Sequence, residues 1–396
     1  MLTPRSISGP LTHIRELDGL RGLAVLMVVI HHAGIGAGST LAESAVQSLI
    51  DCGWIGVDLF FVLSGFLITR ILLASRENPD YFRQFYWKRT KRILPLYMLA
   101  LSLAFALAPG WWVLKFVTYT ANLTETSWTI EDVSLGHFWS LCVEEHFYLI
   151  WPAVIRFTST QRLPWVILGT AIGSVALRFF MMDFGWSFNE VLRFTPCRLD
   201  SIALGSGLAL FSLKHSGKIA VASLLAAFLL SFYFDKFGTM DVAFGRLLVS
   251  LGCAGLVAYV IDAQPKLLTD PWLVRAGELS YGIYVWHYLF ASQLVSVSSV
   301  MLDDYGYWLG TAFSVAGWLG LGVVLATVSE RLIEKPVRNW SGENFLAPGV
   351  FLNTFMQRVV QCQHAVSGRS ADVGKDLDGD LARELSGSTE PRPETD

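Results

Sequence analysis

The chain has 396 residues, of which 53% are hydrophobic and only 16% are charged, and its mean hydropathy is +0.46. Soluble domains carry about 25% charged residues, so this composition excludes an ordinary soluble protein and favours one embedded in a lipid bilayer. The formal net charge of −3 points to no class of partner, and we expect no nucleic acid among the partners.

Long apolar runs recur along the chain, each close to the roughly 20 residues that a helix needs to cross the hydrocarbon layer. Ten candidate spans lie at residues 17–34, 54–74, 93–109, 137–157, 162–182, 197–213, 219–234, 246–262, 277–297 and 307–330. The apolar stretch at 111–122 is too short to cross and is predicted to be re-entrant or interfacial. The sequence therefore predicts an all-α, polytopic transmembrane helical bundle of about ten spans.

Lysine and arginine concentrate in alternate loops. If the N-terminus is cytoplasmic, the inside segments hold Arg76, Arg83, Lys88, Arg89, Lys91, Arg92, Arg156, Arg162, Lys214, Lys218, Lys266, Arg331, Lys335 and Arg338. The outside loops are mainly acidic, as in Asp303–Asp304. This positive-inside pattern predicts that both the N- and C-termini are cytoplasmic.

Two regions differ in composition. We predict one transmembrane domain over residues 1–340 and a polar cytoplasmic tail over 341–396. The tail is largely disordered from about residue 367, because it is rich in charge, Gly, Ser and Pro. The five cysteines form no CxxC motif or disulfide framework, and we expect no metal.

The first span carries ionisable residues that cost at least about 2.5 kcal/mol each at mid-helix. Arg21 and His32 are eleven residues apart, so they share a helix face and lie about 16 Å apart along the axis. Asp18 can pair with Arg21, and His31 points about 100° away from His32. Either Arg21 reaches the headgroups and both histidines lie at the interface, or Arg21 and His32 line a polar cavity.

The second and third spans add polar groups. Asp58 and Ser64 interrupt the second span, whose glycines Gly53, Gly56 and Gly65 are small enough for close helix contact. The stretch "FYWKRTKRILPLY" then places Lys88, Arg89, Lys91 and Arg92 at the start of the third span. These cations are either an ordinary positive-inside anchor or a phosphate-binding cluster, because guanidinium groups suit phosphate oxygens.

The later spans carry further candidates. Glu144 and Glu145 project about 100° apart, so at most one is expected to face a given cavity. Arg198 and Asp200 open the sixth span, where a local ion pair is the competing explanation. Ser280, Tyr284 and His287 are spaced i, i+4 and i+7 and so form one polar stripe on a helix. Glu334 lies at the end of the last span and is able to pair with Arg338.

These stretches resemble the acyltransferase-3 family of integral membrane O-acyltransferases. The matching pieces, in family order, are "LDGLRGLAVLMVVIHH", "GVDLFFVLSGFLITRIL", "KRTKRILPLY", "FWSLCVEEHFYLIWP", "RLDSIALGSGLAL", "LSYGIYVWHYLF" and "ERLIEKPVRNW". The resemblance implies an enzyme of the bacterial cytoplasmic (inner) membrane, multi-pass. Its activity would move an acyl group, most often acetyl, from cytoplasmic acyl-CoA to a hydroxyl of a cell-surface or exported carbohydrate.

The resemblance also assigns residues. The family's arginine-ten-residues-histidine pattern falls on Arg21 and His32, its cytoplasmic arginine motif on Arg89 and Arg92, and its Glu-x-Pro on Glu334. On this hypothesis the cations at 88–92 hold the CoA phosphates, Arg21 orients the donor, and His32 is the general base or an acyl carrier.

Other roles stay open at this level. Glu144, Glu145 or Glu334 orients His32, and Arg21, Ser64 or Tyr284 stabilises the oxyanion. The residues expected to line the substrate cavity are Asp58, Ser64, Arg198, Asp200, Ser280, Tyr284 and His287. Two other function classes compete with the enzyme. One is a proton-coupled transporter or flippase, because intramembrane charges also mark transport. The other is a sensor or scaffold.

Overall fold

The computed structural model describes residues 2–4, 13–33, 39–123, 129–130, 133–233 and 238–340. It divides into two compact units, Met1–Arg338 and Asn339–Asp396. The predicted polar tail at 341–396, including the segment from 367 onward, lies outside the described residues. The description below therefore concerns the first unit.

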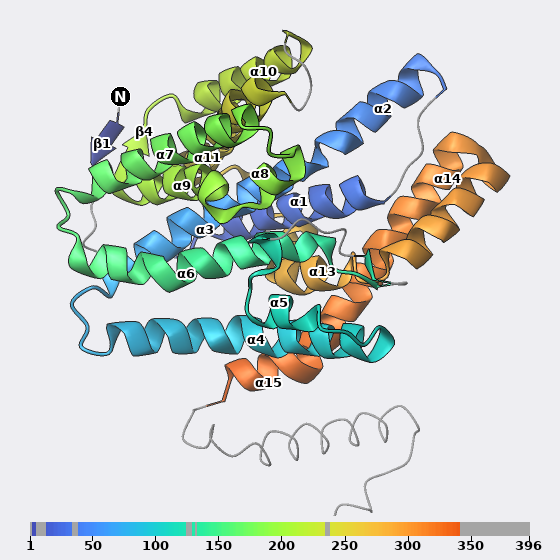
Figure 1. Ribbon diagram of the computed structural model, residues 1–396, viewed down its shortest axis with the longest axis horizontal. Coiled ribbons are helices and arrows are strands. Elements are labelled where there is room, and N and C mark those ends of the chain that lie inside the picture. Colours follow the sequence, from blue (N-terminus) through green and yellow to red (C-terminus); the bar gives the residue numbers. More distant parts are fainter. Residues whose placement is uncertain are drawn as a thin grey trace, which may run out of the picture. The chain divides into compact units, whose positions relative to one another are not determined.

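The first unit is built almost entirely from helices (Figure 1). The α-helices are α1 Arg15–His32, α2 Leu41–Asp51, α3 Ile55–Ala74, α4 Tyr81–Leu107, α5 Val113–Val117, α6 Trp139–Phe157, α7 Leu163–Asp183, α8 Phe188–Arg193, α9 Leu199–Leu210, α10 Ser216–Tyr233, α11 Arg246–Ala263, α12 Pro271–Glu278, α13 Ser280–Trp286, α14 Ala291–Ser329 and α15 Lys335–Arg338. Two π-helical turns, Asp241–Gly245 and Glu330–Glu334, precede α11 and α15. The all-α expectation is met for the described residues.

The strands are short. β1 (Leu2–Pro4) pairs antiparallel with β4 (Phe211–Leu213), and β2 (Thr129–Ile130) pairs antiparallel with β3 (Val133–Ser134). The first pair places the beginning of the described chain beside the end of α9. Neither pair contributes a sheet that organises the fold.

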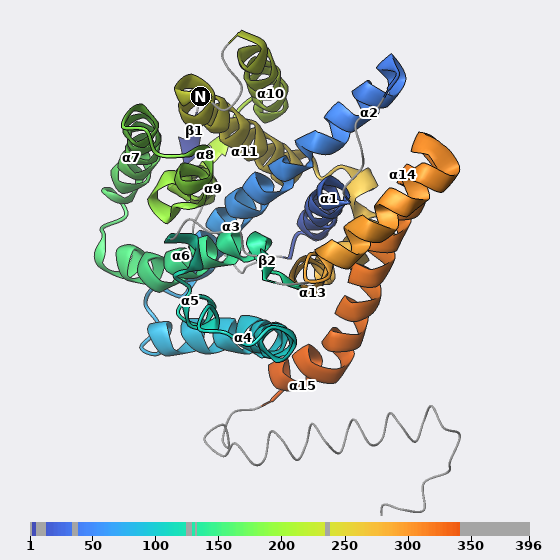
Figure 2. The ribbon, with the colours of Figure 1, turned by 45° about the vertical axis from the view of Figure 1, so that its right-hand side comes forward.

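Helix α1 lies in the middle of the unit, against α3, α12, α13 and α14 (Figure 2). Helix α3 lies beside it and also contacts α6, α9 and α11. Figure 1 shows α4 and α5 on one side of α6, and α7, α9, α10 and α11 on the other. Residues from α1, α3, α6 and α13 therefore meet in the interior. These helices carry most of the polar residues that interrupt the predicted spans.

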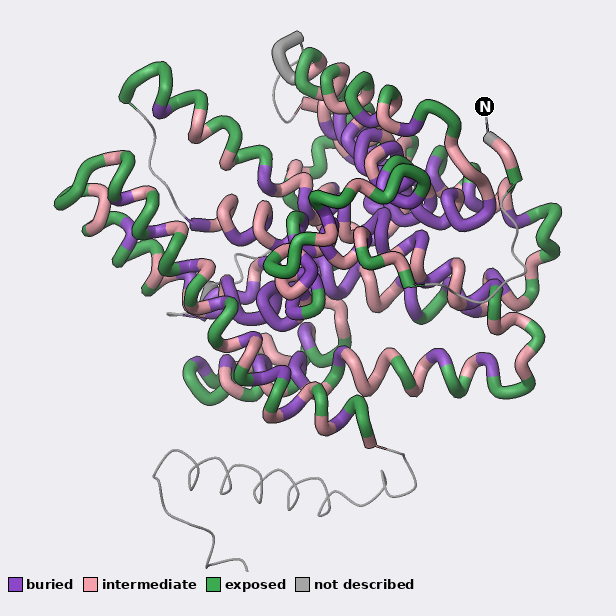
Figure 3. The backbone as a smooth tube through the Cα atoms, turned by 180° about the vertical axis from the view of Figure 1, so that it is seen from behind, coloured by how far each residue is buried: buried purple, intermediate pink, exposed green. Residues whose placement is uncertain are grey.

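The distribution of buried residues fits a bundle surrounded by lipid. Buried residues concentrate in the central helices, whereas the peripheral helices keep exposed faces (Figure 3). On α7 those exposed residues are apolar, among them Trp165, Leu168 and Ile172. A large apolar side chain facing outward is unfavourable in water and favourable against acyl chains, so this face of α7 is suited to contact lipid.

Five described helical segments are long and apolar enough to cross a membrane, at Leu41–Ala74, Tyr81–Leu107, Leu163–Asp183, Asp241–Ala263 and Ala291–Arg338. Helices α1 and α6 are long enough but carry four and three charged residues respectively. Helix α9 has only 12 residues, and the apolar part of α10 is also short. Each of the ten predicted spans overlaps a helix, but the count of ten and the cytoplasmic termini stay predictions.

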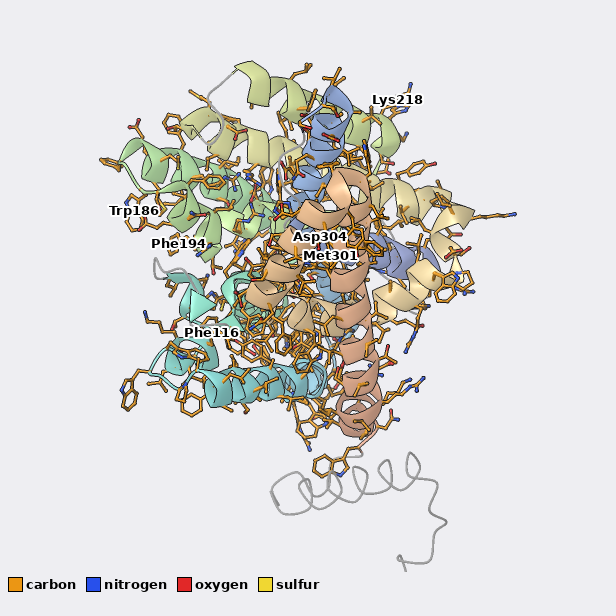
Figure 4. The ribbon with its side chains drawn as sticks, turned by 90° about the vertical axis from the view of Figure 1, so that its right-hand side faces the viewer. Phe116, Trp186, Phe194, Lys218, Met301 and Asp304 are labelled. Atoms are coloured by element: carbon orange, nitrogen blue, oxygen red, sulfur yellow. The ribbon has the colours of Figure 1, made fainter. Side chains whose placement is uncertain are left out.

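The predicted ninth and tenth spans have an irregular form. Helix α13 ends at Trp286, and α14 is two helices joined at Gly306, whose φ of 73° favours glycine. A Cβ on Gly310 would lie 2.6 Å from Cα of Leu302, so the two parts of α14 fold back closely on each other. Figure 4 labels Met301 and Asp304 on this part of the chain.

The stretch at 111–122, predicted not to cross, contains the five-residue helix α5 and part of the 3-10 turn Ala121–Leu123. Helix α5 contacts α4, and Phe116 on it is labelled in Figure 4. The hydroxyl of Tyr97 on α4 donates to the carbonyl oxygen of Phe116 at 2.9 Å. The segment is thus held against protein, as expected for a short apolar stretch.

Glycines set the spacing of the central helices. A Cβ on Gly65 of α3 would lie 2.1 Å from the carbonyl oxygen of Ile202 on α9, and one on Gly205 would lie 2.0 Å from that of Val62. On the other side of α3, Gly56 faces the carbonyl of Ala24 on α1 at 2.4 Å, and Gly53 similarly abuts α1. The predicted role of Gly53, Gly56 and Gly65 in close helix contact is confirmed.

The α3–α9 contact yields a test. Gly205→Ala forces the two helices apart and is expected to destabilise the protein by about 1–3 kcal/mol, the usual effect of overpacking. Thermal unfolding of the purified protein in detergent measures the change. Gly169→Ala on α7 is the matched control, because nothing lies within 4 Å of its Cβ position and alanine favours a helix. Equal stability of the two variants would contradict this role for Gly205.

Candidate active site

A cavity of about 830 Å³ lies among the central helices. Its walls come from α1, α3, α4, α6, α12, α13 and the segment 330–338, so helices far apart in sequence contribute to one space. Among its lining residues are seven arginines and lysines: Arg21, Arg70, Arg89, Arg92, Arg275, Lys335 and Arg338. Five carboxylates also line it: Asp18, Glu144, Glu145, Glu278 and Glu330.

Both glutamates of α6 line the cavity, so the expectation that at most one would do so is wrong. The reason is geometric, since the cavity covers more than a 100° arc of α6. Glu144 is fixed by two hydrogen bonds, from Ser64 Oγ at 2.7 Å and from the Tyr148 hydroxyl at 3.2 Å. Among the described residues, no side chain donates a hydrogen bond to Glu145, which lines the cavity.

Arg21 enters the cavity from α1. Its Nη2 donates to Ser280 Oγ on α13 at 3.2 Å. The Asp18 carboxylate, expected as its partner, instead contacts His13 Nε2 at 2.7 Å. Arg21 is thus tied to the polar stripe of α13, and its remaining donors are available to a bound molecule.

Of the four cations at 88–92, Arg89 and Arg92 line the cavity and Lys88 and Lys91 do not. The Arg89 guanidinium lies 5.3 Å from the ring centroid of Tyr148, a cation–π contact. Among the described residues, no carboxylate forms an ion pair with Arg89 or Arg92. Two unneutralised guanidinium groups on one side of a cavity favour an anionic ligand. Lys91 Nζ instead donates to the carbonyl oxygen of Arg338 at 3.3 Å and so joins α4 to α15.

The polar stripe of α13 marks the inner end of the cavity. Ser280 and Tyr284 line it, and His287, one turn further, does not. The Tyr284 hydroxyl donates to the carbonyl oxygen of His137 at 2.9 Å and lies 2.5 Å from Ser140 Oγ. These contacts hold the ring between the cavity and the residues beyond it.

Beyond Tyr284 lies a group of histidines that we call the histidine cluster, His32, His137 and His287. The rings of His32 and His287 have centroids 5.1 Å apart, and those of His137 and His287 are 5.0 Å apart. Tyr288 packs against His32 with ring centroids 4.6 Å apart. His287 and His137 are 0% and 3% exposed, whereas His32 is only partly buried, so His32 is the member of the cluster that can be reached from outside.

Hydrogen bonds assign the protons within the cluster. His287 Nδ1 lies 2.8 Å from the Tyr284 carbonyl oxygen, and His32 Nδ1 lies 2.9 Å from that of Val28. A carbonyl oxygen only accepts, so both Nδ1 atoms carry protons in the neutral rings. His287 Nε2, 3.3 Å from His32 Nδ1, then accepts from it. The arrangement leaves the lone pair of His32 on Nε2, where a base or nucleophile needs it.

The expected carboxylate partner of His32 is not found among the described residues. Glu144 and Glu145 line the cavity, and Glu334 accepts from Ser329 Oγ at 3.4 Å. The ring of His32 is oriented by Val28 and His287 instead. His32 itself lies outside the cavity lining, although Arg21 on the same helix lies inside it.

Sequence reasoning missed His137. It precedes α6 and is the first residue of the predicted fourth span. In the predicted topology the first span ends, and the fourth span begins, at the outer side of the membrane. Matching the depths of histidines across predicted spans would have paired it with His32. Among the described residues, no group of three or more His, Cys, Asp or Glu side chains is arranged to hold a metal ion.

Three residues expected in the cavity belong to a separate buried network. Arg198 donates to Asp58 Oδ1 at 2.7 Å, and Arg178 forms a two-pronged ion pair with Asp200, both contacts at 2.8 Å. Two serines join these ion pairs: the Ser201 hydroxyl donates to Asp58 at 3.0 Å and lies 2.7 Å from Ser250 Oγ, which reaches Asp200 at 3.5 Å. Asp58, Arg198 and Asp200 do not line the cavity, and Arg198 pairs with α3 rather than with its neighbour Asp200. Buried charges need partners, and these join α3, α7 and α9.

A second set of charges surrounds Glu330, at the start of the π-helical turn before α15. Arg275 of α12 contacts both Glu330 and Glu278, and these hydrogen bonds raise the pKa of Arg275 above its usual range. Lys335 and Arg338 also reach Glu330, at 3.5 and 4.0 Å. Sequence analysis assigned no role to Arg275 or Glu330.

The chain matches a family model and several known proteins. The model of the acyltransferase-3 family, described as an acyltransferase domain, matches residues 14–329. A candidate O-acetyltransferase of Staphylococcus aureus strain COL is 24% identical, over 96% of this chain and 67% of its own length. A candidate peptidoglycan O-acetyltransferase of Bacillus subtilis is 28% identical, over 84% and 56%.

The peptidoglycan O-acetyltransferase OatA of Listeria monocytogenes is 26% identical, over 82% of this chain and 56% of its own length. The chain therefore spans between about half and two thirds of the length of these relatives. No solved structure matches the chain.

The buried network makes a prediction about stability. Asp58→Ala leaves the Arg198 guanidinium without its carboxylate, and loss of one member of a buried ion pair costs about 3–5 kcal/mol. We expect the variant to be present in membranes at a strongly reduced level, measured by immunoblotting of a tagged chain. Glu145→Gln, which alters a carboxylate that faces the cavity, should retain the wild-type level. A stable Asp58→Ala protein would contradict the structural role.

Proposed function

The chain belongs to the acyltransferase-3 family, and on that premise we propose that it is a membrane O-acetyltransferase that moves acetyl groups from acetyl-CoA to carbohydrate hydroxyls. The acceptor in this proposal is a cell-surface or exported glycan, such as an O-antigen or exopolysaccharide. The names of the relatives support O-acetylation, and two of those names specify peptidoglycan. The observation that carries the proposal is that one helix, α1, contributes Arg21 to a cationic cavity and His32 to the histidine cluster.

The first part of the proposal is the donor. CoA carries several phosphate groups at one end and a thiol at the other. Arg89 and Arg92 present guanidinium groups to the cavity without a carboxylate partner among the described residues, which suits phosphate binding. Arg21 and Ser280 lie on the way from these cations to Tyr284, where they can hold the amide-rich pantetheine arm.

The second part is the chemistry at His32. Nε2 of His32 removes the proton from an acceptor hydroxyl while the oxygen attacks the thioester carbonyl carbon. A C–O bond forms and the C–S bond breaks, and the departing CoA thiolate takes the proton back from the imidazolium. His287 accepts from Nδ1 of His32, so it holds the ring in the required tautomer and stabilises the positive charge.

The same lone pair on Nε2 serves either direct transfer or an acyl-imidazole intermediate, since both begin with a free Nε2. In the second route Nε2 attacks the thioester and CoA thiolate leaves. The acceptor oxygen then attacks the acyl carbon, the C–N bond breaks, and the released Nε2 takes the hydroxyl proton and passes it to the CoA thiolate.

The third part concerns access. Tyr284 and Ser140 form the inner wall of the cavity, and His32 lies beyond them. A thioester in the cavity therefore reaches His32 only when the Tyr284 side chain moves aside. Ser64 donates to Glu144, and the Tyr284 hydroxyl donates to the His137 carbonyl oxygen. The same movement of the Tyr284 side chain frees its hydroxyl, and its ring packs against His287 at 5.5 Å between centroids. We assign the oxyanion contact to the Tyr284 hydroxyl.

The proposed location is the bacterial cytoplasmic membrane, crossed several times, with both termini in the cytoplasm. The five long apolar helical segments support a multi-pass protein, and the positive-inside loop charges support the orientation. In this orientation Arg89 and Arg92 lie near the cytoplasmic supply of acetyl-CoA, and His32 lies toward the side from which an exported glycan arrives.

His32→Ala tests the catalytic assignment. General-base catalysis is worth about 10²–10⁴-fold, so the variant should lose nearly all acetylated product. Mass spectrometry of cell-surface glycans, from cells with and without the protein, measures the acetyl mass shift and names the acceptor class.

His31→Ala is the matched control for this experiment, because it removes the adjacent histidine of the same helix and leaves the His32–His287 contact intact. Both variants should reach wild-type levels in the membrane. Full product formation by His32→Ala would overturn the assignment, and transport of an unmodified glycan would favour a transporter.

Arg89→Ala with Arg92→Ala tests the donor site. Loss of two charge-assisted contacts should weaken CoA binding by about 10- to 100-fold or more, measured as the Kd of the purified protein in lipid nanodiscs. Arg83→Ala, an exposed position on the same helix that does not line the cavity, should leave the Kd unchanged. An unchanged Kd in the double variant would mean that the pair only anchors the helix.

A further inference from the structure

The cavity holds a second group of cations that the proposed function has not used. Arg275, Lys335 and Arg338 all reach the Glu330 carboxylate, at 2.5, 3.5 and 4.0 Å, and all line the cavity. We call these three residues the α12–α15 trio. They come from two elements separated by more than fifty residues of sequence, so the fold rather than local helix geometry brings them together.

The exposures of these side chains differ in an informative way. The Glu330 side chain is 7% exposed, whereas those of Arg275, Lys335 and Arg338 are 38%, 49% and 48% exposed. The carboxylate therefore lies beneath the cations and holds three like charges close together, which would otherwise repel one another. Arg275 also contacts Glu278 at 2.8 Å, so two carboxylates offset three cations, and each cation keeps donor atoms that neither carboxylate uses. Such a preorganised group of cations above a buried carboxylate is suited to bind a further anion.

The trio and the Arg89–Arg92 pair face the same cavity. Lys91, between those two arginines, donates to the carbonyl oxygen of Arg338 and holds α15 against α4. The cavity thus presents two separate sets of cations to one ligand. A ligand with two separated phosphate groups matches this arrangement better than a ligand with one.

We propose that the α12–α15 trio is a second phosphate subsite, which binds the ribose 3′-phosphate of CoA while Arg89 and Arg92 bind the diphosphate. The inference rests on the proposed function, since it takes CoA as the donor. CoA carries a diphosphate on the 5′ side of its ribose and a single phosphate on the 3′ oxygen. The diphosphate leads into the pantetheine arm, and the 3′-phosphate lies at the opposite end of the molecule from the thioester.

Which set of cations binds which phosphate of CoA follows from how deep each set lies in the cavity. The thioester must travel past Arg21 toward Tyr284, so the diphosphate lies between that path and the adenosine. The half-exposed trio lies where the adenosine end of the ligand remains near the opening, and the 3′-phosphate belongs to that end. The subsite would make the protein select CoA over donors that lack the 3′-phosphate.

Comparison of CoA with 3′-dephospho-CoA tests this selection directly and needs no acceptor. The Kd values of both ligands are measured for the full chain in lipid nanodiscs. The wild-type protein should bind CoA about 10- to 100-fold more tightly than 3′-dephospho-CoA, the usual range for a few charge-assisted hydrogen bonds. In the double variant Lys335→Ala with Arg338→Ala, CoA binding should weaken to the level of 3′-dephospho-CoA, whose own Kd should change little.

Two control variants separate the possible outcomes. Arg331→Ala removes an exposed cation of the same π-helical turn that does not line the cavity, and it should keep the wild-type preference. Arg89→Ala should weaken both ligands by a similar factor and also keep the preference.

Equal wild-type affinity for the two ligands would overturn the subsite while leaving acetyl-CoA as the donor. Equal weakening of both ligands in the Lys335→Ala, Arg338→Ala variant would also overturn it. A wild-type protein that binds neither ligand would overturn the proposed donor, and the subsite with it.

Discussion

The cost of placing charge among apolar helices is the constraint on which the rest of the structure depends. Hydrocarbon offers no partners to a buried charge, so every ionisable side chain in the bundle needs a protein group, a ligand or a route to water. The chain meets this need in two ways. Asp58 with Arg198, and Asp200 with Arg178, neutralise each other within the α3–α7–α9 packing. Arg89 and Arg92 have no such carboxylate among the described residues, and they face a cavity instead. A cation that the fold leaves unneutralised beside a cavity can be neutralised by a ligand. The same holds for the excess positive charge of Arg275, Lys335 and Arg338, which share Glu330. A one-to-one buried pair such as Asp58 with Arg198 contributes to packing instead.

Helix α1 connects these two environments because its neighbours approach it very closely. Gly56 of α3 and Gly53, in the turn just before α3, lie against its backbone on one side. Gly277 of α12 lies on another side, where an added Cβ would lie 1.8 Å from the Asp18 carbonyl oxygen. With so little space between backbones, α1 can neither rotate nor slide without disturbing its neighbours. The direction of Arg21 toward the cavity and that of His32 toward His287 are therefore fixed together. A fixed offset along one rigid helix suits a reaction in which one end of a long donor is held while the other end reacts.

Much of this arrangement follows from sequence, and the rest depends on contacts between distant elements. Hydropathy and the period of 3.6 residues place the helices and put Arg21 and His32 on one face, because both properties are local. The same helical geometry misjudged Glu144 and Glu145, since a broad cavity covers more of a helix than a single direction. Arg198 and Asp200 are close in sequence, which suggests that they pair with each other. Each instead pairs with a residue of another helix, and such a contact cannot be predicted from local sequence. The histidine partner of His32 was unpredictable for the same reason. The contact between His32 and His287 depends on how α13 packs beside α1. The carboxylates expected as partners, Glu144, Glu145 and Glu334, do not contact His32.

The break between α13 and α14 shows why hydropathy alone also misjudges spans near a site. A continuous helix from 277 to 297 would satisfy all its backbone groups but would keep one polar face toward lipid for its whole length. The chain instead ends α13 at Trp286. The carbonyl oxygens of Ile283 and Trp286 still accept from the backbone N–H groups of His287 and Leu289, whereas those of Tyr284 and Val285 are left to side chains among the described residues. Side chains of the site use these groups: His287 Nδ1 donates to the Tyr284 carbonyl, and His137 Nε2 lies 3.3 Å from that of Val285. The irregular backbone thus fixes the tautomer of the ring that orients His32. Non-helical backbone at membrane depth is tolerated where protein covers it, and here it supplies the acceptors that a regular helix would have used itself.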